Sequence, residues 1–154
     1  MPRWLLLAAA CITFVINGSA LAQQPSETDA VKAANQAFYT ALSARDLGAM
    51  QKVWSSDPEI QNIGPANTTI TVGWENIKKG FEGTFDRFPD LKASQKELRI
   101  KIVGAVAWVS GVEDVERKDK SGAASRGANF GTNIFQKQDG RWVMVYHHAS
   151  VIPQ

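Results

Sequence analysis

The two histidines of the chain stand side by side, and they are the side chains best suited to proton transfer near neutral pH. His147 and His148 lie in a final segment rich in aromatic and β-branched residues, which predicts a strand. Side chains alternate across a strand, so at most one of the two imidazoles can face a given cavity. The sequence therefore offers one histidine as a general acid or base. It predicts no metal site, because the imidazoles diverge and no third ligand is suitably spaced.

A second group of candidate residues is aromatic and falls on the apolar faces of segments with helical periodicity. These residues are Trp54, Trp74, Phe81 and Phe85. Such spacing is more typical of an ordinary hydrophobic core than of a ligand site. A cavity lined by these rings would nevertheless accept a flat or apolar small molecule, so all four are candidate ligand-binding residues.

Apolar residues at helical spacing predict three helices in the first half of the chain. The first ends near Ala44, the second is capped by Asp46, and the third ends at Phe88. Two short strands, at residues 59–63 and 68–72, are predicted between the second and third helices.

The second half of the chain is predicted to form a sheet. Alternation of side-chain character indicates strands at 98–102, 105–117 and 126–137. A final strand follows Asp139-Gly140, a strong hairpin signal because a type I′ turn needs positive φ at both central positions. Glycines inside the strands usually mark bulges or sharp bends, and here they are Gly111, Gly127 and Gly131. Helices followed by a bent antiparallel sheet define an α+β fold.

The first 22 residues have the pattern of a secretory signal peptide. A basic start, a short apolar run and the cleavage motif Ala20-Leu21-Ala22 predict removal of residues 1–22, with an uncleaved anchor as the alternative. The mature chain, 23–154, is then one exported domain, periplasmic or secreted, without Cys11, which is the only cysteine. The formal net charge of +2 indicates neither a nucleic-acid partner nor a membrane partner after signal cleavage.

Several short motifs occur in an order typical of a known family. They are Ala44-Arg-Asp46, a helix ending in Trp54, Gly73-Trp-Glu-x-Ile77, Val106-Ala-Trp-Val109, Asp139-Gly-Arg-Trp142 and His147-His-Ala-Ser150. The chain resembles the SnoaL-like branch of the superfamily that includes nuclear transport factor two, ketosteroid isomerase and the association domain of calcium/calmodulin-dependent protein kinase II. This resemblance implies a cone, with three N-terminal helices packed on a strongly curved antiparallel sheet and a pocket at the wide end. The convex face of the family's sheet commonly dimerises.

The resemblance also implies which polar residues line the pocket. In the kinase association domain, arginines that converge in the pocket occupy the positions that resemble Ser110, Asn133 and Ala149. Ser110 and Asn133 are therefore candidate ligand-binding residues, and His147 should face the pocket on the side of Ala149. None of the three arginines is present here, so a carboxylate-binding pocket of that kind is not expected.

Ketosteroid isomerase uses an aspartate base beside a tyrosine. The best matching carboxylate is Asp114, which shares a predicted strand face with Trp108 and Ser110. The available phenols are Tyr39 and Tyr146. We therefore predict His147 and Asp114 as catalytic candidates, with Tyr39 and Trp108 added to the ligand-binding set. The alternative for Asp114 is a solvated carboxylate beside the next turn.

Three functions remain open at this point. The leading hypothesis is an exported, homodimeric domain that binds a small apolar or aromatic molecule in an aromatic-lined pocket, with or without catalysis. The first alternative is an isomerase or cyclase that uses general acid/base chemistry through His147 and Asp114. The second alternative is a homo-oligomeric accessory or assembly module. No cofactor is predicted by any of the three.

Overall fold

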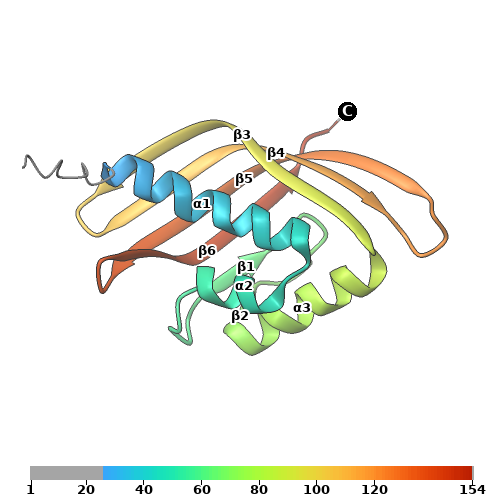
Figure 1. Cartoon of the computed structure of the whole chain (residues 1–154), viewed down its shortest axis with the longest axis horizontal. Coiled ribbons are helices and arrows are strands. Elements are labelled where there is room, and N and C mark those ends of the chain that lie inside the picture. The colour runs from blue at the N-terminus through green and yellow to red at the C-terminus, as the bar shows by residue number, and fades with distance from the viewer. Residues whose placement is uncertain (1–25, 154) are drawn as a thin grey trace, which may run out of the picture.

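The computed structural model describes residues 26–153, and the predicted signal peptide lies outside them. The elements are α1 (Glu27–Ala44), α2 (Leu47–Val53), β1 (Gln61–Ile63), β2 (Thr71–Val72), α3 (Trp74–Arg87), β3 (Asp90–Val103), β4 (Val106–Lys118), β5 (Ala124–Gln138) and β6 (Arg141–Val151). Figure 1 shows α1 lying across one face of the sheet, with α2 and α3 beyond its C-terminal end. The predicted α+β cone of three helices packed on a curved, unclosed sheet is confirmed.

The sheet is mixed, so the antiparallel pairing expected from the sequence holds for β3 to β6 but not for the contact of β1 with β6. Its strand order is β2-β1-β6-β5-β4-β3. Strands β3 to β6 form an antiparallel meander, whereas β1 pairs with β6 in parallel. The chain between β1 and β6 includes a helix and three long strands, so no local turn determines their relative direction.

Local capping chemistry determines where the first two helices begin and end. The Ser26 side chain accepts a hydrogen bond from the Asp29 amide at the start of α1. Arg45 has a left-handed conformation (φ 56°) at the end of α1, and Asp46 then caps α2 by accepting from the Ala49 amide at 2.9 Å. The two helices are thereby fixed against each other. Among residues 26–153, no helix combines the length and apolar character needed to span a membrane.

Gly111 accommodates an irregularity in the neighbouring strand instead of bulging itself. The pairing of β3 with β4 shifts between Lys96 and Arg99, where Glu97 has a φ of 56°. A Cβ atom on Gly111 would lie 2.4 Å from the Lys96 carbonyl oxygen. Glycine at this position therefore lets the backbone of β3 press against β4.

A bulge in β6 decides which of the two adjacent histidines faces the helices. Met144 pairs with Phe135 and Tyr146 pairs with Ile134, so Val145 has no partner on β5. The extra residue reverses the alternation beyond it. As a result His147 is buried on the inner face of the sheet together with Met144, whereas His148 is only half-buried.

Candidate functional site

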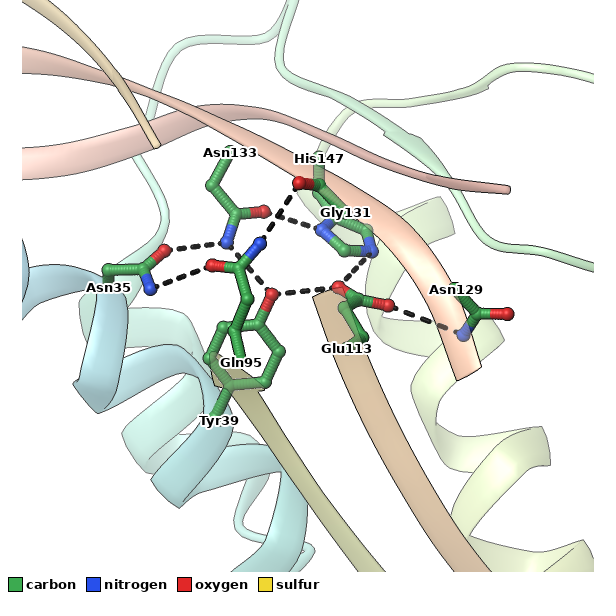
Figure 2. Close-up of polar contacts among 8 residues, drawn as sticks. All are labelled: Asn35, Tyr39, Gln95, Glu113, Asn129, Gly131, Asn133 and His147. Atoms are coloured by element: carbon green, nitrogen blue, oxygen red, sulfur yellow. Dashed lines mark hydrogen bonds and ion pairs between the residues drawn. The ribbon is translucent and has the colours of Figure 1, made fainter. Parts of the chain in front are cut away.

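A buried carboxyl group lies inside the cone, at the centre of a hydrogen-bonded network (Figure 2). Glu113 on β4 is 4% exposed. Its Oε1 accepts a hydrogen bond from the Tyr39 hydroxyl at 2.7 Å, and its Oε2 accepts a longer one from Asn129 Nδ2 at 3.4 Å. His147 Nε2 lies 4.0 Å from Glu113 Oε1. We call the whole group the polar cluster, and it comprises Asn35, Tyr39, Gln95, Glu113, Asn129, Asn133 and His147.

Asn133 connects the histidine to helix α1. Its Nδ2 donates to Asn35 Oδ1 at 2.7 Å and to the Tyr39 hydroxyl oxygen at 3.2 Å. Its Oδ1 must therefore be the acceptor for His147 Nδ1, which lies 2.6 Å away. This network assigns the proton of the neutral imidazole to Nδ1, so Nε2 presents a lone pair on the side of Glu113.

The register of β4, β5 and β6 brings these side chains onto one face. Glu113 pairs with Asn129, and Asn133 pairs with His147. Cross-strand partners share a face and lie close together. Gly131 leaves the space that Glu113 fills, because a Cβ atom there would lie 2.6 Å from Glu113 Oε1. Gln95 completes the network by donating to the Gly131 carbonyl oxygen at 2.9 Å.

Burial shifts the acid–base equilibria of the cluster toward uncharged forms. Desolvation raises the pKa of Glu113 above its usual value, and the hydrogen bonds from Tyr39 and Asn129 oppose this only in part. Desolvation, followed by the proximity of His148, lowers the pKa of His147 to about 3. Burial, together with the neighbouring Glu113, also raises the pKa of Tyr39. A neutral imidazole beside a carboxyl of raised pKa is an arrangement suited to proton transfer.

Aromatic rings from α1 and α3 pack against the polar cluster. The Phe38 ring centroid is 4.9 Å from that of His147 and 6.3 Å from those of both Trp54 and Phe81. Phe81 in turn stacks on Phe85 at 6.0 Å. In the described interior, polar side chains from the sheet and from α1 thus lie against aromatic rings from the helices.

The structure brings together most of the residues singled out from the sequence. Buried around the cluster are Tyr39, Trp54, Phe81, Phe85, Asn133 and His147. Trp74, at the start of α3, is partly buried against the same hydrophobic core.

Three predicted residues lie on the opposite face of β4, and their predicted orientation was wrong. Trp108 is 39% exposed, Ser110 is half-buried, and Asp114 forms an ion pair with Lys96 at 2.7 Å. The cause is the regular pairing of β4 with β5, which places Glu113, not Asp114, opposite Asn129. The sequence reasoning therefore missed Glu113. The available signal was the glycine pair, since aligning Gly111 with Gly131 sets this register.

Two hollows of the surface are lined by other residues. One, of about 610 Å³, lies between the alanine-rich faces of α1 and α2 and is bordered by Trp142. The other, of about 430 Å³, is lined mainly by charged side chains at the far ends of β3, β4 and β5. Within residues 26–153, no three histidine, cysteine, aspartate or glutamate side chains gather as a metal site would require.

The chain belongs to the SnoaL-like domain family, whose model matches residues 31–154. A curated relative, the F-box protein SKIP8 of Arabidopsis thaliana, is 26% identical over 125 residues. That match covers 81% of this chain and 51% of the relative, so the chain spans about half the length of the curated protein it matches.

Solved structures share the fold at low sequence identity. A candidate dehydratase of the nuclear transport factor 2-like family from Streptomyces avermitilis has a TM-score of 0.75 at 18% identity, covering 82% of this chain and 97% of that one. A candidate calcium/calmodulin dependent protein kinase II association domain from Xanthomonas campestris has a TM-score of 0.74 at 21% identity, and the match covers 84% of this chain and 91% of that one. A ketosteroid isomerase-like protein from Erwinia carotovora atroseptica has a TM-score of 0.70 at 19% identity, and the match covers 82% of this chain and 96% of that one. These likenesses establish the fold.

Proposed function

We propose that the domain binds a small, flat, mostly apolar molecule in the interior of the cone, where the polar cluster contacts the molecule's polar group. The observation that carries this proposal is the burial of Glu113 beside His147 Nε2 at 4.0 Å. A buried carboxyl is costly to a fold unless it is paired, and Glu113 has only Tyr39 as a close donor. Titratable groups in such surroundings concentrate at functional sites.

Acid–base catalysis at the same site is the second candidate function. Environments that push the pKa values of neighbouring groups apart are typical of acid–base pairs, and the shifts of Glu113 and His147 favour this. Isomerisation and dehydration both move a proton, and a carboxyl with a raised pKa suits that task. The names of two structural neighbours, a candidate dehydratase and a ketosteroid isomerase-like protein, point to the same reaction class. In this role Glu113 takes the place that the sequence suggested for Asp114.

The ligand would reach the polar cluster from the side of α3. Phe81 and Phe85 of this helix are buried, and Phe81 packs against Phe38, which in turn contacts His147. Helix α3 has no side-chain cap at its N-cap residue Gly73, unlike α1 and α2. We infer that entry involves a displacement of α3 from the sheet.

Replacement of Glu113 by leucine is expected to weaken binding of a hydroxylated aromatic probe about tenfold, the loss of one hydrogen bond to a carboxyl. The probes are 1-naphthol, 4-hydroxyacetophenone and benzyl alcohol, titrated while tryptophan fluorescence is followed. The Tyr39 hydroxyl loses its acceptor in this variant, so the unfolding transition of the variant is measured alongside binding. Asp114→Asn is the matched control, since Asp114 lies next in sequence but on the outer face.

Two results would contradict the binding proposal. One is the absence of saturable binding of all three probes at millimolar concentration. The other is an unchanged dissociation constant in Glu113→Leu together with a cooperative unfolding transition, which would make Glu113 a structural residue only.

We also propose that the protein forms a homodimer through the outer face of β4, β5 and β6. Large apolar side chains are exposed there, with Phe130 58% and Trp108 39% accessible. Exposed apolar surface of this kind is typical of an interaction site. Residues 1–22 support the additional proposal that the domain acts after export, in the periplasm or the medium.

Phe130→Glu is expected to convert the dimer into a monomer, because it places a charge in the apolar outer face. Sedimentation velocity at micromolar concentration measures the change. Gln36→Glu makes the same change of charge on the exposed side of α1 and should leave the oligomeric state as it is. A wild-type protein that sediments as a monomer would refute the dimer without affecting the ligand-binding proposal.

A further inference from the structure

Two buried polar atoms lack a hydrogen-bond partner anywhere within residues 26–153. They are Nε1 of Trp54, whose side chain is 96% buried, and Oδ1 of Asn62. Most buried polar groups in folded proteins are paired, so an unpaired donor and an unpaired acceptor in one interior require an explanation. Neither atom belongs to the polar cluster as defined above.

The two side chains flank the same edge of β6. Asn62 on β1 pairs in parallel register with His147, and Trp54 forms an isolated parallel bridge with Met144. Met144 and His147 both face the interior. Parallel partners present their side chains on the same side of the sheet, so Asn62 and Trp54 border the interior that contains the polar cluster.

The Phe38 ring links these two atoms to the cluster. It lies 6.3 Å from Trp54 and 4.9 Å from His147, measured between ring centroids. The Phe38 ring thus packs between the Trp54 indole and the His147 imidazole. The unpaired atoms and the polar cluster therefore lie on two sides of one region of the interior, with Phe38 between them.

The polar groups of this region are mostly acceptors, and none carries a positive charge. The Trp54 indole supplies a donor, whereas Asn62 Oδ1 and His147 Nε2 are acceptors. Glu113 adds a carboxyl on the same side. A carboxylate ligand would meet these acceptors and the Glu113 carboxyl with only neutral donors, the indole N–H and the Asn62 amide, and no cation to hold it. A group that both donates and accepts would satisfy the indole and the asparagine together.

We propose that Trp54 and Asn62 form a ligand subsite that selects a neutral carboxamide or hydroxyl group over a carboxylate. The ligand oxygen accepts from Trp54 Nε1–H, and the ligand N–H or O–H donates to Asn62 Oδ1. This inference rests on the proposed function, because it specifies the chemical class of the same ligand. It assigns Trp54 a directional role in place of a purely apolar one.

The test uses benzamide and benzoate, which have nearly the same shape but differ in charge and in donor capacity. Indole N–H resonances of the ¹⁵N-labelled protein are followed at pH 7 during each titration, and Trp54→Phe identifies the resonance of Trp54. We expect benzamide to shift this resonance saturably and to bind at least tenfold more tightly than benzoate. Trp54→Phe and Asn62→Leu should each weaken benzamide binding at least fivefold. Trp108→Phe is the control, since Trp108 lies on the outer face.

Failure of this inference and failure of the proposed function give different results. Benzoate binding as tightly as benzamide would overturn the subsite, and so would unchanged benzamide binding in both Trp54→Phe and Asn62→Leu. The subsite is likewise overturned if 1-naphthol binds in a Glu113-dependent way while benzamide does not bind. If neither benzamide, benzoate nor the hydroxylated probes bind, the ligand-binding proposal itself is refuted and the subsite with it.

Discussion

Wild-type protein is expected to lose about 2 kcal/mol of stability relative to a His147→Gln variant when the pH is lowered from 7.5 to 5. The folded-state pKa of His147 is about 3, below the unfolded value of 6.5. The unfolded chain therefore takes up the proton first. The stability that the neutral imidazole contributes is present above pH 6.5 and is lost as the pH falls toward 3, by about 1.4 kcal/mol per pH unit.

The comparison with His147→Gln is needed because the titration of Glu113 changes the stability of the fold with pH in the opposite direction. Its folded-state pKa is raised above 4.5, so its contribution is complete below that pH and is lost as the pH rises through the folded value. Urea unfolding of both proteins across the pH range isolates the histidine. His148→Gln is the control, since its side chain lies on the other face of β6. Parallel pH profiles for wild type and His147→Gln would show that His147 is not desolvated as described.

Gly111→Ala is expected to destabilise the fold by about 3 kcal/mol, at the upper end of the usual cost of overpacking. The new Cβ atom would lie 2.4 Å from the Lys96 carbonyl oxygen, and only movement of the β3 backbone can relieve that contact. Gly131→Ala should cost less, because the Glu113 side chain is its obstacle. Denaturant unfolding at pH 7 measures the free energy of unfolding of both variants and of a third, Gly127→Ala, each relative to wild type.

Gly127→Ala is the matched control for this series. Gly127 also lies within a strand, but a Cβ atom there would meet nothing within 4 Å. Alanine should be tolerated at this position or stabilise it slightly, because glycine weakens a strand. Equal stabilities of Gly111→Ala and Gly127→Ala would mean that β3 does not press on β4 as the structure has it.

The features that follow from local chemistry were predictable from the sequence. Asp46 caps α2 as expected, and Asp139 and Gly140 both have the positive φ of a type I′ turn. Helical spacing also placed Phe38, Phe81 and Phe85 in the interior. In each case a few neighbouring residues determine the outcome, so no knowledge of tertiary contacts was needed.

The features that depend on pairing between distant segments were not predictable in this way. On β4, Ala107 and Val109 are buried while Trp108 and Val112 lie on the other face, so apolar character alone does not reveal the inner side. Only the register with β5 places Glu113 inside, which is why the sequence favoured Asp114 instead. The parallel contact of β1 with β6, and with it the position of Asn62, also depends on tertiary structure.

The unpaired Val145 also shows how this strand absorbs a change of length. If β6 ran through Val145 without the bulge, regular alternation from Met144 would turn Tyr146 and His148 inward and His147 outward. Deletion of Val145 would instead leave Met144 and His147 on the inner face, because the remaining residues then alternate regularly. The bulge is therefore an inserted residue that β6 accommodates without changing which side chains face the interior.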